Sequence, residues 1–205
     1  MAEALLDQAA HETAHVEHKT NHGVSNNKLA MWVFLGSECL LFGALISTYL
    51  LYRHNTQAGP EPGPEFFDIP FTSASSFVLL MSSLTMVLSH SAAERGDQKR
   101  LKTWLAATAL LGSTFIAGQI YEFTSFVREG LGWTTSPFSS AFYTLTGFHG
   151  VHVTLGVVML LSLLVSAFRG RMHPGNAETV EIVGLYWHFV DVVWVFIFTV
   201  IYLAA

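Results

Sequence analysis

Five long apolar segments make up most of the chain, and they constrain its fold more than any other feature. The segments are Leu29–Leu51, Phe71–His90, Thr103–Val127, Phe138–Phe168 and Ile182–Ala205. A helix needs about 20 apolar residues to cross a bilayer core roughly 30 Å thick, and every segment reaches that length. The sequence therefore predicts an all-α fold, a polytopic membrane bundle of five transmembrane helices.

The composition agrees with a membrane domain. Hydrophobic residues make up 51% of the chain and charged residues only 12%, whereas about a quarter of the residues of a soluble domain are charged. The net charge of −5 comes without a cluster of Lys and Arg, so nothing marks a nucleic-acid partner. We predict a polar, His-containing tail at residues 1–28 and one five-helix transmembrane domain at residues 29–205.

The distribution of basic residues predicts the orientation in the membrane. Residues 1–28 are polar and acidic, so no cleavable signal is visible and we expect the first helix to insert by itself. Counting on alternate sides of the five segments puts Arg53 and Arg128 on one side. The other eight basic residues fall on the opposite side: Lys19, Lys28, Arg95, Lys99, Arg100, Lys102, Arg169 and Arg171. The positive-inside rule then places the N-terminus in the cytoplasm and the C-terminus outside.

Two features outside this pattern bear on metal or redox chemistry. On a helix, four histidines of the tail would share one face: His11, His15, His18 and His22. A metal-binding arm could use that spacing, but intermixed charges and the lack of an apolar face favour a solvated tail. The single cysteine, Cys39, excludes a disulfide within the chain and a CxxC site, and we expect it to be a small buried apolar residue.

Glu38 lies in the first segment, close to the middle of the bilayer. It is about 13 Å from the cytoplasmic end at 1.5 Å per residue. An ionisable group at depth costs at least about 2.5–3.5 kcal/mol, so it normally faces the bundle interior, finds a partner and marks a functional or assembly site. A carboxyl there would be protonated unless a His, a lipid headgroup or water answers it. A plain interhelical hydrogen bond and a proton-handling or lipid-organising role are both open.

Three further pairs of polar residues lie three positions apart, and a helix brings both members of each pair to about the same face. His149 and His152 are flanked by small residues that let another helix approach, so interhelical hydrogen bonding is the default interpretation. Ligation of a metal or haem, with Glu38 or Asp191 as further ligands, is the alternative. We expect His188 to donate a hydrogen bond to Asp191 within one helix. Gln119 and Glu122 form the third pair.

Around these residues the sequence resembles a known family. The stretches that carry the resemblance are Gly36–Glu38, Gln119–Phe123, Gly147–Val153 (GFHGVHV) and Tyr186–Trp194 (YWHFVDVVW). Together they resemble subunit III of the haem–copper oxygen reductases, most closely cytochrome c oxidase subunit III in its five-helix form. The similarity runs from about Asn27 to the end of the sequence. Longer family members have seven helices, so the lipid cleft that their first two helices help to form is not carried over.

The resemblance implies an accessory subunit without haem or copper of its own, in a bacterial-type cytoplasmic membrane. It would pack on the catalytic subunit I beside subunit II, hold phospholipid and support proton uptake, while cytochrome c or quinol delivers electrons through other subunits. It implies no catalytic, cofactor-binding or metal-ligating residue here, and a hydrogen-bonded polar interior made of Glu38, Gln119, Glu122, His149, His152, His188 and Asp191. Arg169 would contact a lipid phosphate.

Three alternatives follow from these observations. Subunit III of a quinol oxidase is the nearest, although Glu38 and Phe148 favour the cytochrome c branch. A b-type cytochrome membrane anchor and a small proton-coupled transporter belong to different classes. The transporter is disfavoured because the sequence has neither an inverted repeat nor broken helices.

Overall fold

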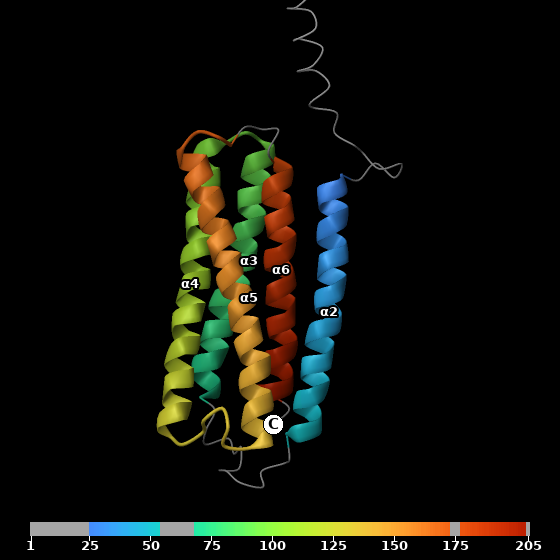
Figure 1. The fold of residues 1–205 in the computed structure, drawn as a ribbon. Coiled ribbons are helices and arrows are strands. Elements are labelled where there is room, and N and C mark those ends of the chain that lie inside the picture. The colour runs from blue at the N-terminus through green and yellow to red at the C-terminus, as the bar shows by residue number, and fades with distance from the viewer. Residues whose placement is uncertain (1–24, 54–67, 173–176, 204–205) are drawn as a thin grey trace, which may run out of the picture.

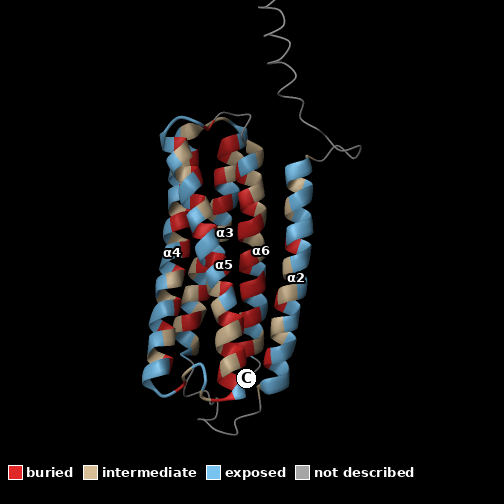
Figure 2. Cartoon of the chain, viewed as in Figure 1, coloured by how far each residue is buried: buried red, intermediate tan, exposed pale blue. Residues whose placement is uncertain are grey.

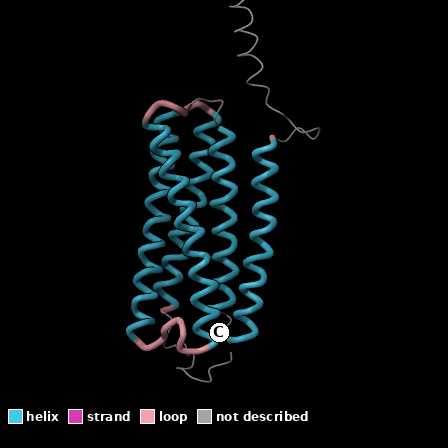
Figure 3. The backbone as a smooth tube through the Cα atoms, in the orientation of Figure 1, coloured by secondary structure: helices cyan, strands magenta, loops and turns pink. Residues whose placement is uncertain are grey.

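A computed structural model of the protein describes residues 25–53, 68–172 and 177–203. Five long helices stand side by side (Figure 1): α2 (Asn26–Tyr52), α3 (Ile69–Glu94), α4 (Gln98–Arg128), α5 (Pro137–Phe168) and α6 (Ala177–Phe198). A single π-helical turn, η2 (Thr199–Leu203), continues α6. Every helix is long and apolar enough to cross a membrane, and the described residues contain no strand (Figure 3). The predicted all-α bundle of five spans is confirmed.

Each helix except the last begins at a polar cap, before the apolar segment that predicted it. Asp68 accepts a hydrogen bond from the N–H of Phe71 at 3.0 Å, and Asp97 accepts one from the N–H of Arg100 at 3.0 Å. Ser136 forms a reciprocal capping box at the start of α5. These caps satisfy N–H groups that a helix start leaves unpaired, so the helices extend past the hydrocarbon-compatible residues.

The helices alternate in direction, so Ser25 and Leu203, the first and last described residues, fall at opposite ends of the bundle. We call the end where α2, α4 and α6 begin the predicted inner end, following the positive-inside prediction. The turn between α3 and α4 lies there, and Gly96 takes a φ of 69° in it, a left-handed conformation that favours glycine.

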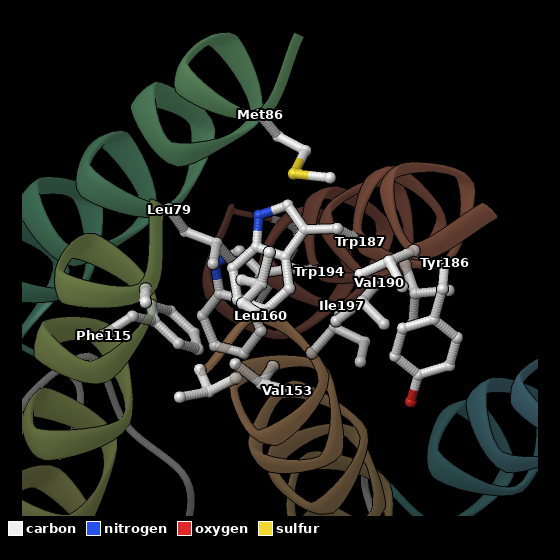
Figure 4. Packing of buried hydrophobic residues seen from close by; sticks show 14 of the residues in the cluster. Leu79, Met86, Phe115, Val153, Leu160, Tyr186, Trp187, Val190, Trp194 and Ile197 are labelled. Carbon is white, nitrogen blue, oxygen red and sulfur yellow. The ribbon is translucent and has the colours of Figure 1, made fainter. Parts of the chain in front are cut away.

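Helices α3, α4, α5 and α6 form the core, with two tryptophans of α6 at its centre (Figure 4). Trp187 fits between two glycines: a Cβ on Gly112 would lie 2.5 Å from the indole Cη2, and one on Gly156 would lie 2.7 Å from Cζ3. The indole N–H of Trp187 donates to the hydroxyl of Ser82 at 2.9 Å. Small residues on neighbouring helices therefore make room for a large side chain, and a serine satisfies its polar edge.

Helix α2 is the least buried element and stands beside α5 and α6 (Figure 2). Its buried residues are Leu35, Phe42 and Tyr49, which repeat every seven positions and form one narrow seam. Cys39 is exposed, so the prediction that it is buried is wrong. The reason is that α2 has neighbours on one side only, whereas the prediction assumed that a helix of the bundle is enclosed.

Candidate functional site

Glu38 and His152 form a polar link between α2 and α5. Glu38 Oε2 lies 3.2 Å from His152 Nε2, and the two side chains are only 14% and 11% exposed. The Tyr186 hydroxyl donates a hydrogen bond to the backbone carbonyl of His152 at 3.0 Å, which adds α6 to the link. Phe42 packs edge-on against the His152 ring, with centroids 5.0 Å apart. The partner of Glu38 is therefore a histidine, which is one of the three partners expected from the sequence.

The hydrogen bonds of His152 define how this link shares its protons. Nδ1 lies 2.7 Å from the carbonyl oxygen of Phe148, and a carbonyl can only accept, so Nδ1 carries a hydrogen. In a neutral ring, Nε2 is then an acceptor. A hydrogen bond with Glu38 needs one proton between the two side chains, as a carboxylic acid donating to Nε2 or as an imidazolium donating to a carboxylate.

Two more contacts hold α2 to α6 at the predicted inner end. Lys28 Nζ lies 2.8 Å from Glu181 Oε1, and the Ser25 hydroxyl donates to Glu178. Ser25 also caps α2 by accepting from the N–H of Lys28 at 3.2 Å. The thin apolar seam of α2 is therefore supplemented by polar contacts at its start and near its middle.

Glu122 belongs to a separate group at the opposite end of the bundle. Its Oε1 accepts hydrogen bonds from the Thr72 hydroxyl at 2.7 Å and from the Tyr202 hydroxyl at 3.1 Å. All three side chains are buried, so this carboxyl joins α3, α4 and η2. Gln119, predicted as its pair, points elsewhere and donates through Nε2 to the carbonyl of Thr146 at 3.2 Å.

His149 is fully buried among aromatic rings. It stacks on Trp194 with centroids 4.9 Å apart and meets Phe115 edge-on at 6.0 Å. Neither ring nitrogen has a hydrogen-bond partner within the described residues. The prediction that His149 forms interhelical hydrogen bonds is wrong, because α4 and α6 present rings to it rather than polar groups.

The predicted hydrogen bond between His188 and Asp191 is also absent from the described part of the chain. His188 Nδ1 instead lies 2.6 Å from the Ser83 hydroxyl of α3. Ser83 is also beside the Asp191 carboxyl, but neither carboxyl oxygen of Asp191 has a partner with hydrogen-bond geometry. A serine on the facing helix has displaced the i, i+3 contact within α6.

The structure therefore separates the predicted polar interior into several places instead of one hydrogen-bonded cluster. Glu38 and His152 are brought together, while Gln119, Glu122 and the α6 pair each have their own surroundings. The prediction missed the hydroxyl partners that decide this arrangement: Thr72, Ser83, Tyr186 and Tyr202. A signal for Thr72 and Ser83 was present, because α3 carries many serines and threonines in an apolar segment and membrane helices use such residues as interhelical contacts.

Two further predictions concern a metal site and a lipid contact. Across residues 25–53, 68–172 and 177–203, no three His, Cys, Asp or Glu side chains gather as a metal site would require. The tail histidines at 11, 15, 18 and 22 lie outside the described residues. Arg169 is exposed just after α5, at the predicted inner end, and its contact with a lipid phosphate stays a prediction.

A comparison with known families identifies the chain. A family profile described as cytochrome c oxidase subunit III matches residues 4–205. The chain belongs to the cytochrome c oxidase subunit III family. The predicted recognition and the predicted function as a subunit III of a haem–copper oxidase are confirmed, and with them the location in a bacterial cytoplasmic membrane.

Individual relatives in this subunit III family include both kinds of oxidase. The chain is 44% identical to a protein named cytochrome c oxidase subunit 3 from Bacillus sp. (strain PS3), over 87% of this chain and 86% of the relative. It is 37% identical to a probable quinol oxidase subunit 3 from Staphylococcus saprophyticus, over 95% of this chain and 96% of the relative. A probable quinol oxidase subunit 3 from Staphylococcus aureus (strain USA300) is 38% identical over the same shares.

Proposed function

We propose that this chain is the accessory subunit III of a cytochrome c oxidase, with subunits I and II as partners. Haem and copper would reside in those partners, and cytochrome c would deliver electrons through them. Cytochrome c is favoured over quinol as the electron donor because the identity to the cytochrome c oxidase relative is higher, 44% against 37–38% for the quinol oxidase relatives.

The geometry supports a structural and lipid-holding role. Two apolar grooves run along the outer surface of the bundle where lipid chains would lie. One, of about 390 Å³, lies between α2 and α5 and is lined by Leu45, Thr48 and Ala141 among others. The other, of about 320 Å³, lies between α4 and α5 beside Gly147 and Gly150. Concave apolar surfaces of this size suit acyl chains of structural phospholipid.

The polar groups support a helper role in proton uptake rather than a proton channel through this chain. Glu38 is joined to His152, and Glu122 is joined to Thr72 and Tyr202 near the opposite end. No continuous series of hydrogen bonds connects the two carboxyls within the described residues. We infer that the subunit stabilises the neighbouring catalytic subunit, and its proton uptake, by packing and by holding lipid.

The donor can be tested on the purified complex. We expect oxygen consumption with reduced cytochrome c and two additional copper ions in subunit II, because a dicopper centre accepts electrons from cytochrome c. A complex that oxidises quinol but not cytochrome c, and that lacks those copper ions, would make this chain a quinol oxidase subunit III. The staphylococcal relatives favour that second candidate, because their similarity covers more of the chain.

A further inference from the structure

A third groove, between α3 and α6, opens near the predicted inner end of the bundle and is separate from the two grooves proposed to hold lipid. It encloses about 230 Å³. Its polar lining is His90, Glu181 and His188, and its apolar lining includes Met86, Val87 and Leu185. The two polar residues of α6 lie seven positions apart, so they follow one side of that helix from its first turns towards the middle of the membrane.

Beyond the groove the polar side chains continue inwards to Asp191. The Ser83 hydroxyl is 2.6 Å from His188 Nδ1 and also lies beside the Asp191 carboxyl. Asp191 is 3% exposed, and no described residue offers its oxygens a hydrogen bond of ordinary geometry. The series therefore begins at a partly exposed glutamate and ends at a carboxyl enclosed in the bundle.

The groove has the size and polarity to hold water. A water molecule occupies about 30 Å³ of liquid volume and is retained where it finds two to four polar partners. The volume of the groove corresponds to several such molecules, and the side chains of His90, Glu181 and His188 provide donors and acceptors along it. A carboxyl at membrane depth is normally paired or served by a water-filled cavity. Asp191 does not line the groove itself, but His188 does, and Ser83 lies between His188 and the Asp191 carboxyl.

We propose that the α3–α6 groove is a hydrated crevice through which Asp191 exchanges protons with the aqueous phase at the predicted inner end. A proton passes from water to His188 Nε2, and the proton on Nδ1 passes to the Ser83 oxygen. Ser83 releases its own hydroxyl proton to the Asp191 carboxylate in the same step, so its oxygen never carries an extra proton, and the reverse sequence returns a proton to water. No other bond changes, and the site takes up one proton at a time.

The charged groups at the mouth belong to three helices. Glu181 of α6 is paired with Lys28 of α2 at 2.8 Å, and His90 of α3 lies 4.0 Å from Glu94. Lys28 therefore offsets the charge of Glu181, the one acidic residue that lines the groove itself. The crevice is also distinct from the Glu38 link, which lies between α2 and α5.

Water access can be tested by cysteine labelling in the intact oxidase complex. Cys39 is the chain's one cysteine, so Cys39→Ser removes background labelling of this chain, and labelling is quantified on this chain after it is separated from its partners. Val87→Cys and Leu185→Cys place thiols in the groove, while Leu84→Cys and Val192→Cys, at 53% and 54% exposure, place them elsewhere on the surfaces of α3 and α6. The probe is 2-sulfonatoethyl methanethiosulfonate, which is charged and reacts with the thiolate formed in water.

We expect the groove cysteines to react about tenfold faster than the control cysteines, because thiolates form readily only in contact with water. Equal, slow labelling at all four positions would overturn the crevice. Haem content and co-purification of the other subunits are measured on the same samples. Failure of the labelling prediction can therefore be told apart from failure of the subunit III assignment.

Proton exchange at Asp191 has its own test by infrared spectroscopy of the complex. The carboxylic C=O band that disappears in Asp191→Asn is assigned to this group, and its shift is followed after transfer from H₂O to D₂O. We expect prompt exchange in the unaltered chain and much slower exchange in Ser83→Ala and His188→Phe. Absence of any such band, a band that does not exchange in the unaltered chain, or exchange in both variants as fast as in the unaltered chain would overturn the proposal.

Discussion

The link between Glu38 and His152 allows a quantitative prediction. Glu38→Gln keeps a donor for His152 Nε2, because the amide N–H can replace the acid proton, and the volume is nearly unchanged. We expect this variant to lie within about 1 kcal/mol of the unaltered chain. Glu38→Met leaves Nε2 without its partner in surroundings that expose only 11% of the His152 side chain. Leaving a buried polar group unsatisfied costs about 1–3 kcal/mol.

Substitution of the partner, His152, and a double variant isolate the energy of the interaction. His152→Phe keeps a ring against Phe42, whose centroid lies 5.0 Å away, but it leaves Glu38 unpaired, so its cost should be at least as large as that of Glu38→Met. When both polar partners are replaced by apolar groups, neither remains unsatisfied. The double variant Glu38→Met with His152→Phe should therefore cost less than the sum of the two single variants.

The assay is retention of this chain in the oxidase complex during a detergent titration, quantified on native gels. A cost of about 1–3 kcal/mol corresponds to a 5- to 150-fold change in an equilibrium constant, which such a titration resolves. Glu38→Lys adds a cation at depth, which should weaken the binding of this chain to the complex by about 2.5–3.5 kcal/mol. This variant should therefore dissociate most readily. Equal retention of the Gln, Met and Lys variants, or strictly additive costs in the double variant, would refute the reasoning.

Three further predictions concern packing, polar contacts and turnover. Gly156→Ala should destabilise the bundle by about 1–3 kcal/mol, since its Cβ would lie 2.7 Å from the Trp187 ring, whereas the control Gly147→Ala has no atom within 4 Å and should be neutral; thermal denaturation compares them. Tyr202→Phe removes the 3.1 Å hydrogen bond to Glu122 and should cost about 1 kcal/mol in the same measurement. Removing the chain should leave initial oxygen consumption intact but shorten the enzyme's working life or lower its activity at higher pH, and identical lifetimes and pH profiles in matched lipid would leave only an assembly role.

The five helices could be predicted from the sequence because a membrane span must be a long apolar segment, which is visible directly in the sequence. Phe138–Phe168 was predicted where the structure has Pro137–Phe168, and the other starts differ by two to five residues. The differences lie at polar residues such as Asp68 and Asp97. These residues cap the helices ahead of the apolar segments, where an apolar pattern gives no signal.

The polar contacts were less predictable, because they depend on which helix faces which. A spacing of three residues places His188 and Asp191 on one face of α6, but it does not reveal that Ser83 of α3 lies opposite them. His149 was given polar partners because histidine is polar, yet aromatic rings from α4 and α6 surround it. Contacts between helices arise from rotation and packing that one sequence does not specify.

The central claim is that this chain works as a non-redox subunit of a haem–copper oxidase. The most direct measurement is to purify the tagged chain from its native membrane in mild detergent, identify its companions, and record metal content and the visible spectrum of both the complex and the separated chain. We expect subunits I and II to accompany it, with haem and copper in the complex and neither bound stoichiometrically to the separated chain. Purification without a haem–copper subunit I, or one tightly bound haem per separated chain, would contradict the account and favour a b-type cytochrome membrane anchor.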